Sequence, residues 1–396
     1  MGMRIDEEPA TGNDSRAGRR RFLGACLCSL GAIAVGGGIS RVAALSLKGD
    51  QGREGDDSPG PWSVEARFAT SSGDVTHCRK CPHACVLSPG EAGKCRNRVN
   101  HKGKLYSIAY GNPCAVHVDP IEKKPFFHYL PGTRAFSIAA AGCNLRCLNC
   151  QNWQISQFSP RETENADLMP VRVVEEATEA KCASIAYTYS EPTTFYEYTF
   201  DTSRLGRARG IRNLLKSNGY INEEALRHLC RYLDAANIDL KSFSNSTYRR
   251  LSEGSLEPVL RTLKVLREEG VWLEITYLVI PEWTDDQSEI ARMCDWLCKS
   301  GLADAPLHFS RFVPLHKLTQ LPATPVSALE QARAVAGRAG VQYVYIGNVP
   351  GHSAESTVCH RCGKVVIERR GFTVVRQDLA KGACRFCGQH IPGVWS

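Results

Sequence analysis

The apolar residues between positions 136 and 346 form two kinds of segment. Short runs rich in β-branched and aromatic residues are typical of buried strands, and the longer segments between them carry apolar residues at helical spacing. One strand is expected to open at Phe136, and others are expected at 184–187, 212–216, 236–240, 272–280, 307–313 and 341–346. Helices are expected at 171–181, 222–233, 257–269, 285–299 and 326–339. Strands that alternate with helices predict an α/β fold with a parallel sheet, here a partial or full (β/α) barrel.

Polar residues follow the expected ends of several strands. Glu191 and Asn218 come after two of them, and Asp239 and Lys241 close a third. The carboxyl ends of barrel strands carry the active sites of such folds. Asp239 and Lys241 are two residues apart and therefore point to the same face. There they either hold a cofactor or substrate or form an ion pair at the barrel rim.

The loop after the first expected strand holds Cys143, Cys147 and Cys150 in the spacing CxxxCxxC. Three thiolates from one loop can ligate three irons of a [4Fe–4S] cluster and leave the fourth iron open to an exogenous ligand. An open iron distinguishes a catalytic cluster from an electron-transfer cluster. A zinc ion held by three thiolates is the structural alternative. The strand before the loop and the strand–helix units after it favour the cluster.

Four more cysteines lie upstream in the spacing CxxCx3Cx9C: Cys78, Cys81, Cys85 and Cys95. Closely spaced cysteines rarely form good disulfides, so we expect these four to bind a metal. Their number suffices for a four-thiolate zinc site or for a second iron–sulfur cluster, and the spacing does not choose between the two.

The last four cysteines form two CxxCG motifs: Cys359 and Cys362, then Cys384 and Cys387. A glycine after the second cysteine permits the backbone turn that aims amide donors at the sulfurs. The alternating segment VVIERRGFTVV between the motifs predicts a hairpin. We therefore expect a zinc-ribbon-like tail, with rubredoxin-like iron as the alternative.

The first 48 residues have the features of an export signal. Residues 15–24 read SRAGRRRFLG, in which Arg19 and Arg20 form a twin-arginine pair, and an uncharged apolar stretch follows. A transmembrane anchor is the alternative for that stretch, although its glycines disfavour it. Residues 49–61 are rich in Gly, Asp and Pro, which predicts a disordered linker at 49–70. The leader predicts a periplasmic or envelope protein of a bacterium or archaeon; without export the protein would be cytoplasmic.

Composition and charge exclude several classes of protein. Of the 396 residues, 43% are hydrophobic and 23% are charged, which excludes a wholly disordered chain, a collagen-like repeat and a protein with many membrane spans. The formal net charge is +8, and the segment from Cys359 onward holds seven basic and two acidic residues, a net +5. No run of five like charges occurs, so a solvated basic face is favoured and no nucleic-acid partner is expected.

The sequence resembles radical S-adenosylmethionine (SAM) enzymes, and among them the radical SAM component of the AmmeMemoRadiSam system. Activating enzymes of pyruvate formate-lyase are similar at a greater distance. The resemblance lies in CRKCPHACVLSPGEAGKC at 78–95, DPIEKKPFFHYLPG at 119–132, GCNLRCLNCQNWQIS at 142–156, AYTYSEPT at 186–193, AANIDLKSF at 235–243, HFSRFVP at 308–314, VYIGNVPG at 344–351 and the tail that ends in IPGVW. It covers the chain from about residue 78 to the end.

This resemblance implies that Cys143, Cys147 and Cys150 bind a [4Fe–4S] cluster and that SAM chelates the open iron. Such enzymes transfer one electron to the sulfonium of SAM, which yields methionine and a 5′-deoxyadenosyl radical that abstracts a hydrogen atom. An electron donor and a substrate are therefore implied, and a partner protein of the AmmeMemoRadiSam system is a candidate substrate. An exported iron–sulfur electron-transfer protein and a zinc-ribbon RNA-modifying protein are the alternative functions.

The residues expected to bind SAM are Glu191, Asn218, Asp239, Lys241 and Asn348. Glu191 stands where the family's Gly-Gly-Glu segment meets the SAM amino group, although Ser190 precedes it in this chain. Asn149 stands where many relatives have an aromatic residue that touches the adenine. Because Asn149 is not aromatic, the segment Ile346-Gly347-Asn348 is a candidate for packing against the adenine.

The predicted organisation has five parts: a leader at 1–48, a linker at 49–70, a Cys-rich segment at 71–130, a radical SAM barrel at 131–352 and a zinc-ribbon-like tail at 353–396. The barrel is expected to hold the cluster and SAM. The tail is expected to hold zinc.

Overall fold

The structure is a computed structural model that describes residues 59–396, which belong to one compact unit. The predicted leader and residues 49–58 of the predicted linker lie outside the described residues. None of the helices between residues 59 and 396 is long and apolar enough to cross a bilayer.

The end of the predicted linker is a correction, because residues 59–70 already contain strands. Strand β1 (Val64–Glu65) pairs with β6 (Lys104–Ser107), and β2 (Ala69–Ser72) begins before the predicted boundary. Ala66 lies between them and packs in a small apolar cluster with Leu105. Burial of these apolar side chains stabilises the folded conformation of residues 59–70. The overall composition of the segment did not reveal this contribution.

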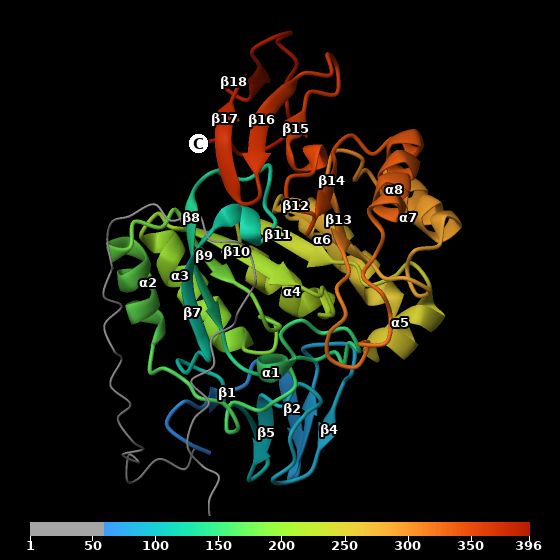
Figure 1. Cartoon of the computed structure of the whole chain (residues 1–396). Helices are drawn as coiled ribbons and strands as arrows, with labels where there is room; N and C mark the ends of the chain where they lie inside the picture. Colours follow the sequence, from blue (N-terminus) through green and yellow to red (C-terminus); the bar gives the residue numbers. More distant parts are fainter. Residues whose placement is uncertain (1–58) are drawn as a thin grey trace, which may run out of the picture. The chain divides into compact units, whose positions relative to one another are not determined.

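The main feature of the fold is an eight-stranded sheet in the order β14-β13-β12-β11-β10-β9-β8-β7 (Figure 1). Its strands are β7 (Ala115–Pro120), β8 (Arg134–Ala139), β9 (Ser184–Tyr187), β10 (Arg212–Ser217), β11 (Ala235–Asp239), β12 (Trp272–Val279), β13 (Leu307–Arg311) and β14 (Val344–Gly347). All pairs from β8 to β14 are parallel, and β7 runs antiparallel to β8. In the described residues no pairing joins β14 to β7, so the barrel is partial.

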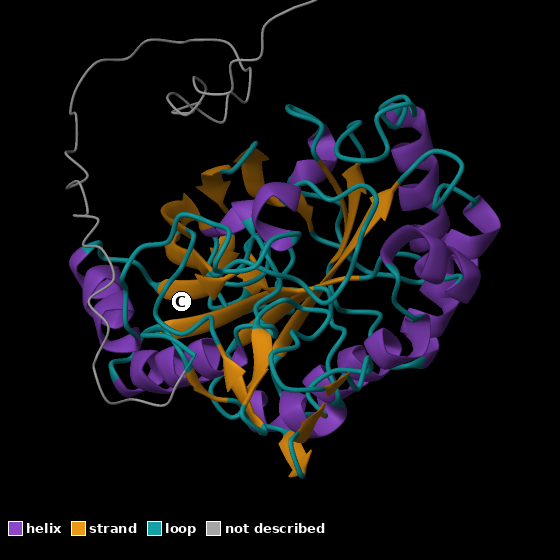
Figure 2. Cartoon of the chain, turned by 90° about the horizontal axis from the view of Figure 1, so that it is seen from below, coloured by secondary structure: helices purple, strands orange, loops and turns teal. Residues whose placement is uncertain are grey.

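Helices follow most strands and cover the outer side of the sheet (Figure 2). They are α2 (Pro170–Glu179), α3 (Tyr196–Ala208), α4 (Glu223–Cys230), α5 (Asn245–Ser252), α6 (Leu256–Glu268), α7 (Gln287–Lys299) and α8 (Val326–Ala339). The five predicted helices are confirmed as α2, α4, α6, α7 and α8, while α3 and α5 were not predicted. Apolar residues of the strands and helices form the main core between the two layers.

The inner side of the sheet is filled at the amino-terminal ends of its strands. The segment after β7, which contains the short helix η1 (Ile121–Lys123), inserts Ile121, Phe126 and Leu130 against four neighbouring strands. The strand residues they meet are Ala135, Ala186, Leu214 and Ala235. This apolar plug closes one end of the partial barrel. The carboxyl ends of the strands, where parallel sheets place their sites, are left free of this plug.

Two smaller regions accompany the barrel. The N-terminal region has the sheets β1-β6-β5 and β2-β3-β4, with β3 (Val75–Cys78), β4 (Val86–Leu87) and β5 (Arg98–His101). The C-terminal region has β15 (Thr357–Val358), β16 (Val365–Arg370), β17 (Thr373–Gln377), β18 (Leu379–Ala380) and β19 (Ala383–Cys384), preceded by η2 (Ser353–Glu355). Strands β16 and β17 pair antiparallel, which confirms the hairpin predicted between the CxxCG motifs.

Candidate active site

The three-cysteine loop runs from β8 to the short helix α1 (Trp153–Ser156) and is tied to distant parts of the chain. Arg146 N and Leu148 N donate to carbonyl oxygens of α5, namely Ser252 O at 2.8 Å and Leu251 O at 2.9 Å. Asn144 Nδ2 donates to Tyr220 O at 2.7 Å. The chain itself thus fixes the loop that presents the cysteines.

Polar groups surround two of the sulfurs. Leu145 N donates to Cys143 Sγ at 3.4 Å, and Asn218 Nδ2 lies 3.7 Å from the same sulfur. Cys150 Sγ lies 3.0 Å from Ser156 Oγ. Donors aimed at sulfur stabilise thiolates and tune a bound metal. These contacts therefore suit metal-bound thiolates better than buried neutral thiols.

Cys147 has a cationic neighbour. Burial raises the pKa of its thiol to about 12, and the Lys241 ammonium opposes that rise. A coordinated metal removes the proton from a thiol, because the metal replaces the positive charge of the proton. The three partly buried thiols on a fixed loop therefore fit a cluster that needs three ligands and leaves one iron open.

Glu191 connects the loop after β9 to the end of β10. Its carboxylate is 2% exposed and accepts hydrogen bonds from Ser217 Oγ at 2.8 Å, Asn218 N at 2.8 Å and Thr193 N at 3.0 Å. Burial raises the pKa of the Glu191 carboxyl group, and these donors oppose that rise. Asn218 in turn reaches Cys143, so two predicted SAM-binding residues and one predicted cluster ligand form one network.

Asp239 and Lys241 form the ion pair that was one of the two interpretations of their spacing. Asp239 Oδ2 lies 3.1 Å from Lys241 Nζ, and Oδ1 lies 2.6 Å from Lys216 Nζ on the neighbouring strand. Burial opposes ionisation of Asp239, but the two ammonium groups lower the pKa of its carboxyl group to about 2. Lys216 is a site residue that the sequence analysis missed.

Ile346 and Asn348, two residues considered for adenine packing, have different surroundings in the structure. Asn348 follows β14 as an exposed residue, and its Nδ2 donates to Arg311 O at 3.0 Å. Ile346 is 1% exposed and packs in the core on the helix side of the sheet, so it faces away from the inner side of the barrel. The role of the segment Ile346-Gly347-Asn348 in packing against adenine stays a prediction. Asn149 Oδ1, beside Cys150, is a buried acceptor with no hydrogen-bond donor among the described residues.

A second polar group on the inner side of the sheet was also missed. Lys124 is 2% exposed, lies 2.5 Å from Asp119 Oδ2 and stacks its ammonium over the ring of Tyr189. The Tyr189 hydroxyl also bonds to Asp119. Burial lowers the pKa of the Lys124 ammonium to about 8, and Asp119 opposes the decrease. The segment DPIEKKPFFHYLPG contains both charged residues, but their contact with Tyr189 could not be inferred from it.

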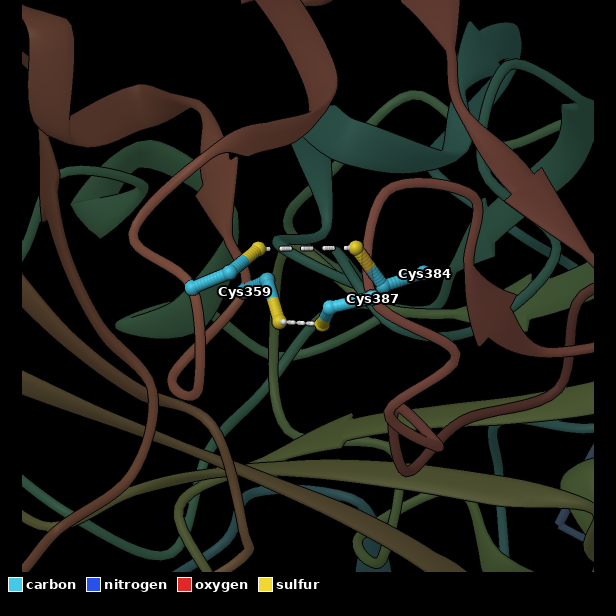
Figure 3. A group of neighbouring side chains, drawn as sticks. Cys359, Cys384 and Cys387 are labelled. Atoms are coloured by element: carbon cyan, nitrogen blue, oxygen red, sulfur yellow. Dashed lines mark hydrogen bonds between the residues drawn. The ribbon is translucent and has the colours of Figure 1, made fainter.

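The C-terminal cysteines converge on one point (Figure 3). The sulfurs of Cys359, Cys362, Cys384 and Cys387 all lie within 4.8 Å of one another. The closest pairs are Cys359 with Cys387 at 3.7 Å and Cys362 with Cys384 at 3.8 Å. Zinc bound at about 2.3 Å in a tetrahedron separates its sulfurs by about 3.8 Å. The spacing of these thiols therefore matches a single tetrahedral ion.

The two knuckles around this group have the same backbone structure. Gly363 N donates to Cys359 O and Gly388 N donates to Cys384 O, each at 2.9 Å. Both glycines have positive φ, 70° and 73°. A side chain would strain this turn, which explains the glycine in each CxxCG motif.

The N-terminal cysteines lie close to the three-cysteine loop. Gly142, directly before Cys143, has φ 99°, and a Cβ there would stand 2.5 Å from Cys95 O. His83 Nε2 is 2.6 Å from Asn144 O, so His83 contacts the loop. Burial raises the pKa of the Cys81 thiol to about 11; Lys80 opposes the rise, and the nearby Cys95 and Cys78 add to it.

Comparison with known proteins identifies the barrel. Residues 137–294 match the model of the radical SAM superfamily. The uncharacterized protein MJ0808 of Methanocaldococcus jannaschii is 44% identical over 330 residues, which make up 83% of this chain and 98% of that protein. The chain belongs to the radical SAM superfamily.

Two further similarities are more distant. The pyruvate formate-lyase 1-activating enzyme of Escherichia coli K12 is 26% identical over 194 residues, 48% of this chain and 76% of that enzyme. The crystal structure of a radical SAM methyltransferase from Sphaerobacter thermophilus has a TM-score of 0.42 at 15% identity, with 56% of this chain and 68% of that chain covered. The radical SAM chain is therefore an enzyme of the activating type, and its superfamily implies a [4Fe–4S] cluster and SAM as co-substrate.

Proposed function

We propose that Cys143, Cys147 and Cys150 hold the [4Fe–4S] cluster of this radical SAM enzyme. The observation that carries the proposal is the continuous network from Glu191 through Asn218 to Cys143 at the carboxyl edge of the sheet. This network connects Glu191, a carboxylate suited to the SAM amino group, with Cys143, a proposed ligand of the cluster. The bound cluster supplies the electron that cleaves SAM.

The side chains around the loop have separate binding roles in this proposal. The Glu191 carboxylate accepts a hydrogen bond from the SAM amino group. It has a lone pair for this bond because only three donors among the described residues bond to it. Lys241, next to Cys147, attracts the SAM carboxylate, and Asp239 keeps that ammonium in place. Asn149 Oδ1 supplies the buried acceptor for the exocyclic amino group of adenine. Asn348 is exposed at the end of β14, and its side chain contributes to SAM binding from the rim of the barrel.

The direct test is SAM cleavage by the reconstituted protein. Full-length chain is loaded with iron and sulfide without oxygen, reduced with dithionite and supplied with SAM. The expected products are methionine and 5′-deoxyadenosine in equal amounts, measured by chromatography. A loaded protein that forms no 5′-deoxyadenosine would contradict the proposal, and one that also fails to bind SAM would favour the electron-transfer alternative.

Glu191→Gln is expected to weaken SAM binding without abolishing it. The lost contact is one charge-assisted hydrogen bond, about 1.5–3 kcal/mol, so the Kd for SAM should rise about tenfold to a hundredfold. Isothermal titration of the loaded protein measures the change. Glu257→Gln, at an exposed side chain, is the matched control and should leave the Kd unchanged. Equal Kd values for Glu191→Gln and wild type would show that another residue holds the amino group.

The substrate we propose is a partner protein of the AmmeMemoRadiSam system. Two observations support it: the resemblance of the sequence to that system, and the similarity to an enzyme whose name states that it activates pyruvate formate-lyase. The group of Asp119, Lys124 and Tyr189 on the inner side of the sheet offers a charged pair and a hydroxyl for that substrate. A one-electron donor is required as well.

We also propose the assignments that accompany this function. The Cys-rich segment at 71–130 and the barrel at 131–352 form the catalytic part, and the tail at 353–396 is a zinc ribbon. The leader at 1–48 exports the protein to the periplasm or envelope. The distances between the four sulfurs of the tail support zinc, and the residues of the leader motif support export.

The leader makes a prediction of its own. Residues 1–60 fused to a folded reporter should be exported through the twin-arginine route, because a cluster must be assembled before the protein crosses the membrane. Replacing both Arg19 and Arg20 by lysine should leave the reporter in the cytoplasm, as measured by fractionation. Arg4→Lys, outside the motif, is the control. Export that persists after the double replacement would exclude this route.

A further inference from the structure

The four N-terminal cysteines are neighbours in the folded N-terminal region. Cys78, Cys81 and Cys95 are 6%, 5% and 7% exposed, and Cys85 is partly buried. Cys78 N donates to Cys85 O at 2.9 Å, so the end of β3 and the start of β4 bring these two residues side by side. Cys85 Sγ in turn faces Gly93, two residues before Cys95.

A buried positive charge accompanies these thiols. Lys80 is 0% exposed, and its Nζ has no hydrogen-bond partner. Among residues 59–396, no carboxylate lies within ion-pair distance of Lys80 in the structure. An isolated buried ammonium group costs several kcal/mol, so Lys80 requires a negative group that the polypeptide alone does not supply.

A second buried cation, Arg98, lies beside these cysteines, but Glu197 already balances its charge. Arg98 is 0% exposed, with Nη1 3.6 Å from Cys78 Sγ and Nη2 2.6 Å from Glu197 Oε1. Glu197 therefore balances Arg98, and the charge of Lys80 remains. Four neutral thiols would not balance it. Four metal-bound thiolates, whose complex is negative overall, would do so.

The distances between the sulfurs distinguish a single ion from a cluster. Four thiolates on one zinc ion must stand about 3.8 Å apart, as the sulfurs of the C-terminal group do. In the described part of the chain that group is the only one of three or more ligand residues placed to hold a single metal ion. Cys95 and Cys78 lie near enough to Cys81 to raise the pKa of its thiol, but the four N-terminal cysteines do not form such a group. A cubic cluster does not need four sulfurs around one ion, because each thiolate binds a different iron.

We propose that Cys78, Cys81, Cys85 and Cys95 hold a second [4Fe–4S] cluster, with Lys80 neutralising part of its negative charge. Four thiolates leave no open iron, so this cluster does not bind SAM. It lies beside the three-cysteine loop, because Cys95 O contacts Gly142. The assignment of this site is independent of the proposed catalytic role of the loop.

The test uses the full-length variant in which Cys143, Cys147 and Cys150 are all alanine. After anaerobic reconstitution it should retain about four irons and four sulfides per chain. Its dithionite-reduced electron paramagnetic resonance signal should not change when SAM is added. Further replacement of Cys81 and Cys85 by alanine should remove all iron and leave the zinc content unchanged. A triple variant that holds zinc instead of iron at the remaining cysteines would overturn the proposal.

The role of Lys80 has a separate readout in the same triple variant. Lys80→Met should shift the midpoint potential of the remaining cluster to a more negative value, because the lost positive charge stabilised the reduced form more than the oxidised form. Lys94→Met is the matched control, since that side chain is 47% exposed. An unchanged midpoint potential in Lys80→Met would refute the proposal that Lys80 neutralises charge on the cluster. Absence of SAM cleavage by the wild-type protein would refute only the proposed function.

Discussion

Replacement of any one of Cys143, Cys147 and Cys150 by alanine is expected to abolish reductive cleavage of SAM. Each cysteine supplies one of only three protein ligands, so its loss releases an iron or the whole cluster. The loop cannot supply a substitute, because backbone hydrogen bonds from Arg146 and Leu148 fix it to α5. The measurement is 5′-deoxyadenosine formed per chain under dithionite, with iron content determined on the same sample.

The scattered cysteines provide the control for this prediction. Cys182 and Cys294 are 7% and 0% exposed and pack in the main core, away from any predicted ligand group. Their replacement by alanine should lower stability slightly and leave SAM cleavage intact. Formation of 5′-deoxyadenosine in any single variant of the loop would remove its three cysteines from the cluster assignment.

Much of the barrel could be predicted from the sequence, because buried parallel strands and amphipathic helices have different apolar periods. Helix α3 was missed for a physical reason. Its sequence, YEYTFDTSRLGRA, is rich in aromatic and β-branched residues of low helix propensity, and tertiary packing overrides that preference. Eight of its residues are buried, including Glu197, so only a narrow polar side with Asp201, Arg204 and Arg207 marked the helix in the sequence.

The cysteine spacings predicted the candidate sites better than any other feature, since ligands from one loop are necessarily close together. Contacts between strands could not be predicted in the same way. Lys216 meets Asp239 because β10 and β11 pair in a register that aligns Lys216 with Asn237. Lys124 meets Tyr189 across 65 residues. Such pairs depend on register and loop path, which no local pattern of residues encodes.

The C-terminal tail is attached to the barrel through buried polar contacts as well as through its own core. Arg369 on β16 donates to Phe127 O at 2.6 Å and to Thr357 Oγ1 at 2.8 Å, and its guanidinium lies over the Phe127 ring. His128 Nδ1 is 2.6 Å from Pro392 O. These contacts join the tail to the segment after β7, which fills the amino-terminal end of the barrel.

Cys384→Ser is therefore expected to release the tail without stopping SAM cleavage. A tail of 38 residues from Cys359 is too short for a large core of its own, so metal binding supplies much of its folding free energy. The variant should lose about one zinc per chain, and limited proteolysis should then cut within the tail. Cys298→Ser, on α7, is the matched control.

The tail and the three-cysteine loop lie at opposite ends of the partial barrel, so the effect of Cys384→Ser on SAM cleavage tests whether the two are coupled. The tail contacts the plugged amino-terminal end, whereas the three-cysteine loop lies at the carboxyl edge of the same strands. Loss of zinc should therefore leave 5′-deoxyadenosine formation without substrate near the wild-type rate. If Cys384→Ser kept its zinc, the tail would not be a four-thiolate site. If it lost iron and SAM cleavage together with zinc, the tail would belong to the redox machinery and would not be a purely structural element.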